Sequence, residues 1–269
     1  NMNMDKLLGT KLFLLDMDGT LYLGDEVFDG AVDFIHTIKN TGREYIYLTN
    51  NSSRAGVDYV TRLRRLGFPC KPENVFTSGM ATAMYLNDKF PGATVYPVGT
   101  PAFLGELESY GVKLGDDESV SVVCVGFDTT LTYEKLDKAV HYLRMNKAAF
   151  IAANPDWVCP MPADEVLPDC GSICALLTAS SGVRPTFIGK PNRNMVDIIS
   201  AQTGVPNANI CCVGDRLYTD IAVAQNADAV SVCVLSGESS MDDINAAERK
   251  PDYILNNVAE IAEILKANA

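Results

Sequence analysis

The sequence predicts an α/β fold, in which a doubly wound, mostly parallel β-sheet carries a second α/β domain as an insertion. Short runs of apolar and β-branched residues alternate with segments whose apolar residues recur at helical spacing, and this alternation is typical of parallel strands connected by helices. The chain has 269 residues, of which 47% are hydrophobic and 21% are charged. That length is sufficient for a core domain and a second domain, and the composition excludes a disordered or collagen-like chain.

The predicted elements begin with a strand at residues 12–15 and a helix whose apolar residues recur between residues 31 and 38. A second strand at residues 45–48 is followed by a helix over residues 57–63. In each helix the apolar residues share one face, which is expected to pack toward a core. Further strand-like runs follow at residues 122–125, 150–152, 187–188, 210–213 and 230–235.

Residues 81–183 are predicted to form the inserted domain, flanked by residues 1–80 and 184–269 of the core domain. The stretch contains strands and helices of its own, and its strand ends carry a different set of polar residues from those of the flanking segments. The borders rest on the turn signals at residues 78–79 and 181–185.

Charge and composition exclude several classes of partner. The chain carries 22 Lys and Arg against 34 Asp and Glu, a net charge of −12 at pH 7, which argues against a nucleic-acid partner because it repels the phosphate backbone. No apolar run reaches the roughly 18 residues that a membrane span needs, and the first residues do not form a secretion signal. The eight cysteines form no C-x-x-C pair, so they are expected to be reduced. We therefore expect a cytoplasmic protein with no membrane partner.

Two carboxylates, Asp16 and Asp18, directly follow the first predicted strand, and Gly19 permits a turn that brings both to one site. The carboxyl edge of a parallel sheet is where ligands bind, and a carboxylate pair suits both cation binding and attack on an electrophile. An ordinary acidic turn is an open alternative, because Asp and Gly are common turn residues. An EF-hand loop is a poor alternative, since Leu21 stands where that loop has glycine.

Polar residues also follow two other predicted strands. Thr49 and Asn50 precede a helical segment, where hydroxyl and amide groups suit an anion but also serve as a helix N-cap. Lys190 follows a short apolar run, between a glycine and a proline. A P-loop is excluded there, because Pro191 occupies the position of the required Ser or Thr. A solvated surface lysine is the plain alternative.

Asp215 and Asp220 complete the set after the strand at residues 210–213. Each of these sites alone has an ordinary structural explanation. Their coincidence at strand ends, in the order acid pair, hydroxyl and amide, lysine, acid pair, is what a metal-assisted phosphoryl site requires. Carboxylates hold Mg²⁺, while a lysine and a hydroxyl hold phosphate oxygens.

This order of motifs resembles the haloacid dehalogenase (HAD) superfamily over essentially the whole chain, and the insertion resembles the type-two (C2) cap of its NagD-like and p-nitrophenylphosphatase branch. The resembling segments are Asp16-Met17-Asp18-Gly19-Thr20, Leu48-Thr49-Asn50-Asn51, Gly189-Lys190-Pro191, Gly214-Asp215 to Asp220, Asn154-Pro155-Asp156, the stretch 168–177 and Val234-Leu235-Ser236-Gly237. The resemblance implies a Rossmann-like core with an inserted α/β cap.

The resemblance also implies roles for the core residues. Asp16 would attack phosphorus, while Asp18 would protonate the leaving oxygen and later activate water. Mg²⁺ would be held by Asp16, Asp215 and the backbone carbonyl of Asp18. Asp220 would orient Lys190 or the surroundings of the metal ion.

For the substrate, the resemblance assigns phosphate binding to Thr49, Asn50 and Lys190. In the cap it leads to four candidates for substrate contact and specificity: Asn154, Asp156, Glu165 and Asp169. The cap departs from the pattern in one place, since Asp169 and Cys170 follow Pro168 where resembling caps commonly read Pro-Gly. An acidic side chain there would disfavour highly charged substrates or contact a sugar hydroxyl.

We therefore expect a Mg²⁺-dependent phosphomonoesterase that hydrolyses a small phosphorylated metabolite through an aspartyl-phosphate. Two alternatives stay open: a phosphotransferase or mutase of the same superfamily, and a non-catalytic sensor of a phosphorylated ligand. Asp18 argues against dehalogenation, because a halide leaves without an acid. A Ser-His-Asp hydrolase is excluded by the lack of a Gly-x-Ser-x-Gly motif and by the two histidines, His36 and His141, which lie in helical patterns. By resemblance alone, a homodimer is compatible with the sequence.

Overall fold

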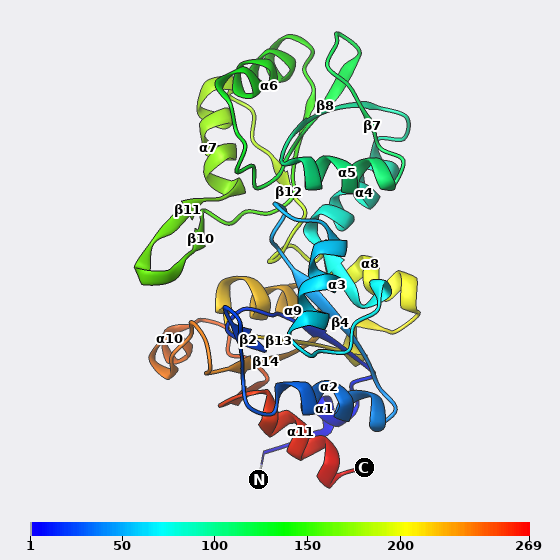
Figure 1. The fold of residues 1–269 in the computed structure, drawn as a ribbon, viewed down its shortest axis with the longest axis vertical. Helices are drawn as coiled ribbons and strands as arrows, with labels where there is room; N and C mark the ends of the chain where they lie inside the picture. Colours follow the sequence, from blue (N-terminus) through cyan, green and yellow to red (C-terminus); the bar gives the residue numbers. More distant parts are fainter. Residues whose placement is uncertain (1) are drawn as a thin grey trace. The chain divides into compact units, whose positions relative to one another are not determined.

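The computed structural model describes residues 2–269, which form two compact units (Figure 1). Unit 1 consists of the residues up to Thr49, Tyr59–Phe76 and Lys190–Ala269, and unit 2 consists of Asn50–Asp58 and Thr77–Gly189. The chain first passes between the units at Thr49 and Asn50, and last at Gly189 and Lys190. The predicted α/β fold class is confirmed, whereas the borders at 80/81 and 183/184 between a catalytic core and a cap stay a prediction.

Unit 1 is built on a six-stranded sheet with the order β15-β14-β13-β1-β4-β5. Its strands are β1 (Leu12–Leu15), β4 (Glu44–Thr49), β5 (Val75–Thr77), β13 (Ile210–Gly214), β14 (Val230–Val234) and β15 (Tyr253–Leu255). β1 pairs in parallel with both β13 and β4, and all four of its residues are buried. The segments that follow β1, β4 and β13 therefore start from the same edge of the sheet, which is where the sequence predicted the site.

Helices and short turns connect these strands. The helices of unit 1 are α1 (Asp5–Leu8), α2 (Ala31–Asn40), α8 (Asn194–Thr203), α9 (Ala222–Asn226), α10 (Met241–Ala246) and α11 (Val258–Ala267), while α3 (Gly56–Arg65) runs from unit 2 into unit 1. The shorter elements are the hairpin β2 (Tyr22–Leu23) and β3 (Glu26–Val27), the 3₁₀ turns η1 (Pro72–Asn74) and η3 (Asn207–Asn209), and the π-helical turn η4 (Leu217–Ile221).

α2 and α11 lie side by side in unit 1 (Figure 1). Gly30 precedes α2 with a φ of 78°, and a Cβ at that position would lie 2.8 Å from the Cβ of Ala259. Only glycine combines this left-handed conformation with so close a helix approach. The apolar face of α2 is buried, and Phe34 meets Phe13 of β1 edge-on, with ring centroids 5.9 Å apart and an interplanar angle of 82°. This contact fixes α2 against the strand that carries Asp16.

Unit 2 contains a five-stranded sheet with the order β12-β9-β8-β6-β7, in which the neighbouring strands pair in parallel. Its strands are β6 (Thr94–Val98), β7 (Lys113–Leu114), β8 (Val120–Val125), β9 (Ala149–Ala152) and β12 (Thr186–Phe187). Its helices are α4 (Ser78–Lys89), α5 (Pro101–Ser109), α6 (Tyr133–Met145) and α7 (Cys170–Ser181). An antiparallel hairpin of β10 (Val158–Pro160) and β11 (Val166–Pro168), with the 3₁₀ turn η2 (Pro162–Asp164), precedes α7.

All eight cysteines are free, and seven of them are buried. Within residues 2–269 the structure contains no helix with the length and apolar character that crossing a bilayer requires. Both histidines lie exposed on helices, His36 on α2 and His141 on α6.

Replacement of the buried Phe34 by alanine is expected to lower the free energy of unfolding by about 3–5 kcal/mol, because it removes the aromatic contact and leaves a cavity against β1. Phe34→Leu, the matched control, keeps most of the volume and is expected to cost less than about 2 kcal/mol. Urea unfolding followed by circular dichroism measures both. Equal losses for the two variants would show that filling this position is not what holds α2 on the sheet.

Candidate active site

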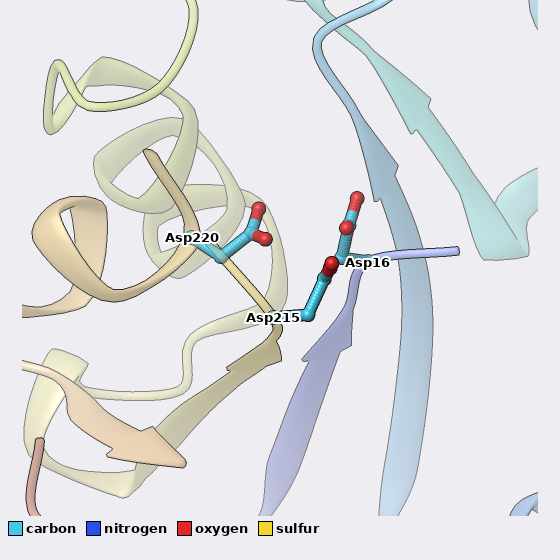
Figure 2. Close-up of side chains that lie close together, drawn as sticks. All are labelled: Asp16, Asp215 and Asp220. Carbon is cyan, nitrogen blue, oxygen red and sulfur yellow. The ribbon is translucent and has the colours of Figure 1, made fainter. Parts of the chain in front are cut away.

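Three carboxylates meet at the carboxyl ends of β1 and β13 (Figure 2). Asp16 directly follows β1, Asp215 directly follows β13, and Asp220 lies in the π-helical turn η4. One oxygen of each carboxylate lies within 4.8 Å of the others. Asp215 and Asp220 are buried, and Asp16 is half-buried. Oxygen ligands at this spacing suit a hard divalent cation such as Mg²⁺.

Lys190 places a positive charge inside this cluster. Its Nζ atom lies 2.6 Å from Oδ1 of Asp220 and 3.5 Å from Oδ1 of Asp16, and its side chain is only 4% exposed. A buried ammonium group needs carboxylate partners of this kind. The structure therefore brings together four of the residues that the sequence singled out: Asp16, Lys190, Asp215 and Asp220.

Burial and mutual repulsion act on the carboxylates. Burial raises the pKa of Asp16 to about 6, with a further increase from the charge of Asp215, while Lys190 acts in the opposite direction. Burial also raises the pKa of Asp220 to about 6, and the charge of Asp16 adds to it. The pKa of Asp215 is raised for the same primary reason. The cluster thus carries negative charge that a cation would stabilise.

The turn after Asp16 is shaped by Gly19, as the sequence predicted. Gly19 has a φ of 83°, and its N–H donates to the carbonyl of Tyr22 at 2.9 Å. A Cβ on Gly19 would lie 2.3 Å from Oδ2 of Asp215, so no other residue fits without displacing that carboxylate. Asp18 lies in this turn, is exposed, and forms an isolated β-bridge with Tyr22.

Arg62 of α3 holds the hairpin that follows Asp18. Its guanidinium lies 5.1 Å from the ring centroid of Tyr22 and donates to a carboxylate oxygen of Asp25 at 3.2 Å. The cation over the aromatic ring and the ion pair act on the same two-stranded hairpin. The segment directly after the acid pair is thereby fixed to α3 within unit 1.

The other predicted residues are divided between the units. Thr49 is the last residue of β4 and is buried in unit 1, whereas Asn50 is the first residue of unit 2. Within unit 2, the Nδ2 atoms of Asn50 and Asn154 donate to the same oxygen of Asp156, at 2.9 and 2.7 Å. Asn50, Asn154 and Asp156 therefore form one hydrogen-bonded group.

Asn154 has no exposed surface. Its Oδ1 accepts from Ser52 at 2.6 Å, and its Nδ2 also donates to Asp169 at 3.0 Å. Asp169 caps α7 by accepting from the N–H of Cys170 at 2.5 Å, which gives a structural reason for an acidic residue at this position. Glu165 lies exposed between β10 and β11.

Sequence reasoning assigned no role to three residues that donate hydrogen bonds to carboxylate oxygens of the acid cluster. Thr20 donates from Oγ1 to Oδ1 of Asp215 at 3.1 Å, and the N–H of Glu238 donates to Oδ2 of Asp215 at 2.9 Å. The backbone N–H of Arg216 donates to Oδ2 of Asp220 at 3.2 Å. In the sequence, only its position next to Asp215 indicates a role for Arg216. No motif predicts a role for Glu238.

Two family models match the chain: a haloacid dehalogenase-like hydrolase over residues 13–113 and a HAD-hydrolase-like family over residues 187–261. An acid sugar phosphatase of Staphylococcus epidermidis is 37% identical over 256 residues, which cover 94% of this chain and 98% of the relative. The chain belongs to the haloacid dehalogenase-like hydrolases.

Solved structures of HAD-like hydrolases show the same fold. A 4-nitrophenylphosphatase from Thermotoga maritima superposes with a TM-score of 0.90 at 42% identity, covering 96% of this chain and 98% of that one. NagD from E. coli K-12 superposes with a TM-score of 0.86 at 32% identity, covering 93% and 98%. The resemblance to the NagD-like and p-nitrophenylphosphatase branch of the HAD family is therefore confirmed.

The raised pKa of Asp16 leads to a prediction about stability without metal. Between the pKa of an unfolded aspartate, 3.8, and about 6, the native chain binds the extra proton, so ionisation of Asp16 destabilises the native state progressively as the pH rises through this window. Asp16→Asn removes that charge. In EDTA near pH 7.5, the variant is expected to melt roughly 2–6 °C above the wild type.

Differential scanning calorimetry between about pH 4 and 7.5 measures this difference, which should shrink toward zero at the acidic end. A variant that melts at the wild-type temperature near pH 7.5, or a difference that is the same at every pH, would contradict the assigned cost of the buried Asp16 charge.

Proposed function

We propose that this chain is a Mg²⁺-dependent phosphomonoesterase that hydrolyses small phosphorylated metabolites through an aspartyl-phosphate on Asp16. The observation that carries the proposal is the cluster of Asp16, Asp215, Asp220 and Lys190 at one edge of the unit 1 sheet. The phosphatase names of the relatives support the reaction class. Free cysteines support a cytoplasmic site of action.

The acid cluster fits a magnesium ion. Asp16 and Asp215 would hold it together with the backbone carbonyl of Asp18, a donor set made only of oxygen. When bound, Mg²⁺ supplies positive charge that offsets the carboxylates and the phosphate dianion. Burial, with a smaller contribution from mutual repulsion, raises the pKa values of Asp16 and Asp215, and a bound cation would offset both costs.

Asp16 acts as the nucleophile in this proposal. One of its carboxylate oxygens attacks phosphorus, the bond from phosphorus to the ester oxygen breaks, and Asp18 transfers its proton to the departing oxygen. The resulting acyl-phosphate is then hydrolysed by a water molecule from which Asp18 takes a proton. Asp18 is exposed, which leaves its carboxylate accessible to a leaving group and to water.

Lys190 offsets charge on the phosphate and on Asp16. Asp220 holds the ammonium group at 2.6 Å, so that its position is fixed before substrate arrives. Thr49 and Asn50 bind phosphate oxygens in the same proposal. Asp156 and Asn154 contribute through Asn50, because the Asp156 carboxylate accepts hydrogen bonds from both amides.

Sugar phosphates are the first substrate class to test, because the relatives in Staphylococcus are named acid sugar phosphatases. The purified chain is expected to release inorganic phosphate from p-nitrophenyl phosphate and from at least one sugar phosphate with Mg²⁺ present. In excess EDTA the rate should fall by a factor of about 10² or more, since the carboxylate cluster then lacks its cation. Release that is the same in both conditions would contradict the metal requirement, and no release with metal would favour transfer to an acceptor or ligand sensing.

Substitution of the acid pair tests the two roles separately. Asp16→Asn is expected to lower kcat about 10³-fold or more, because it removes the nucleophile, and Asp18→Asn about 10²–10⁴-fold, because it removes the general acid. Asp18→Asn should still bind inorganic phosphate in isothermal titration calorimetry. Asp33→Asn, an exposed position on α2, is the matched control and should keep wild-type turnover. Turnover by Asp16→Asn close to that of the control would rule out covalent catalysis by Asp16.

A further inference from the structure

The loop that follows β14, residues 236–239, contacts the acid cluster at two of its backbone groups. The N–H of Glu238 donates to Oδ2 of Asp215 at 2.9 Å, and the N–H of Ser239 donates to the backbone carbonyl of Asp215 at 3.1 Å. Ser236 donates from its hydroxyl to the carbonyl of Gly19 at 2.9 Å. The 236–239 loop is thus bonded both to Asp215 and to the turn that carries Asp18.

The Asp215 carboxylate is tightly packed against the backbone at Gly237 and Gly19. A Cβ on Gly237 would lie 2.1 Å from Oδ2 of Asp215, and a Cβ on Gly19 would lie 2.3 Å from the same oxygen. Thr20 bonds the other oxygen, Oδ1. A shift of the 236–239 loop must therefore move or release the carboxylate, because the loop backbone and the carboxylate are in direct contact.

The side chain of Glu238 fastens this loop. Its Oε1 accepts from the hydroxyl of Tyr218 at 3.0 Å, and its Oε2 lies 3.5 Å from Nε of Arg216. Both partners belong to the segment directly after Asp215. These contacts form a closed ring of interactions that includes the Asp215 carboxylate. The ring runs along the backbone from Asp215 to Arg216, across the ion pair between Arg216 and Glu238, and back through the hydrogen bond from the Glu238 N–H to Asp215.

Arg216 has a second feature that ties it to Glu238. Its Nε atom is buried and makes no hydrogen bond within residues 2–269, and its side chain is 24% exposed. A buried guanidinium nitrogen is costly without a carboxylate nearby. The carboxylates of Asp16 and Asp220 also act on the Arg216 guanidinium, but Glu238 is the carboxylate within ion-pair distance of its Nε. Removal of the Glu238 carboxylate would break that ion pair and detach the 236–239 loop from Arg216.

We propose that Glu238 is a positioning residue for the cation site: held by Arg216 and Tyr218, it keeps its own N–H on Oδ2 of Asp215 and so fixes the carboxylate in the orientation that binds the metal ion. The inference rests on the proposed function in taking Asp215 as a metal ligand. Groups that orient a metal ligand without touching the metal typically contribute 10–100-fold to metal affinity. Glu238 acts in this way through its backbone, with its side chain as the anchor.

Isothermal titration of Mg²⁺ into the metal-free protein tests this role without depending on turnover. Glu238→Ala is expected to raise the Kd for Mg²⁺ about tenfold or more, because the loop loses its anchor. Glu238→Gln, which can still accept from Tyr218, should recover part of the affinity, and Tyr218→Phe should weaken binding by a smaller factor. Phosphate release should mirror these changes as a shift in the Mg²⁺ concentration needed, with the rate regained as Mg²⁺ saturates.

Asp242→Ala is the matched control. It removes one negative charge from an exposed position at the start of α10, close to the loop in sequence, so it reproduces the general electrostatic loss without breaking the ring. Its Kd for Mg²⁺ should stay within about twofold of the wild type, as expected for an exposed and screened charge. If Glu238→Ala fails to fold, Glu238→Gln and Tyr218→Phe carry the comparison.

Three results would overturn the inference. The first is a Kd for Glu238→Ala within twofold of the wild type, and the second is an equal weakening by Asp242→Ala, which would assign the effect to net charge alone. Both leave the proposed phosphatase intact. The third, a wild-type chain that binds no Mg²⁺, would instead remove the proposed metal site and the positioning role together.

Discussion

The close approach of three carboxylates at one edge of a parallel sheet is the constraint on which the rest of unit 1 depends. Burial of these carboxylates, and to a smaller extent the repulsion between them, raises the free energy of the folded chain, as the raised pKa values of Asp16 and Asp220 indicate. Two things make the arrangement tolerable. Lys190 lies against two of the carboxylates, and the strand that presents Asp16 is locked between β4 and β13. The buried sheet therefore holds together three carboxylates that would move apart on a flexible loop. A bound cation would relieve the electrostatic cost of this arrangement.

The central strands could be predicted because burial on both faces leaves a continuous apolar run. β1, β4 and β13 are of this kind, and so are β8 and β9 of unit 2. β6 escaped prediction although it has five mostly buried residues. The edge strand β7 and the hairpin of β10 and β11 escaped it because they have only two or three residues each and are largely exposed. The hydrophobic pattern carries no signal over so short a length. Residues 50–58 are grouped with unit 2, and side-chain hydrogen bonds within it, such as that of Ser52 to Asn154, leave no periodic pattern in the sequence.

The same reasoning explains what was foreseen of the site. Asp16 and Asp215 each follow an apolar run of the unit 1 sheet, so topology alone brings these two strand-end residues to a common edge. Lys190 instead follows β12 of the unit 2 sheet, and it joins the cluster through its contacts with Asp16 and Asp220. The contacts of Arg216 and Glu238 could not be anticipated in this way, because 22 positions and an irregular loop separate them. For Asp169, sequence reasoning weighed only specificity, whereas the structure shows the carboxylate on the first N–H of α7 and on the amide of Asn154. A polar residue at the start of a helix commonly accepts a hydrogen bond from a backbone N–H of the first turn. This capping role can be recognised only once the helix boundary is known.

The π-helical turn η4 has a consequence for the spacing of the two acids that follow β13. A π turn contains about one residue more than an α-helical turn and is frequently found at functional sites. Deletion of a single residue between Asp215 and Asp220 would let the turn close into the α-helical form that α9 adopts directly afterwards. Each residue of an α-helix rotates the next by about 100°, so the Asp220 carboxylate would swing away from Lys190 even though no acid had been lost. Length as well as residue type is therefore what the chain must keep in this segment.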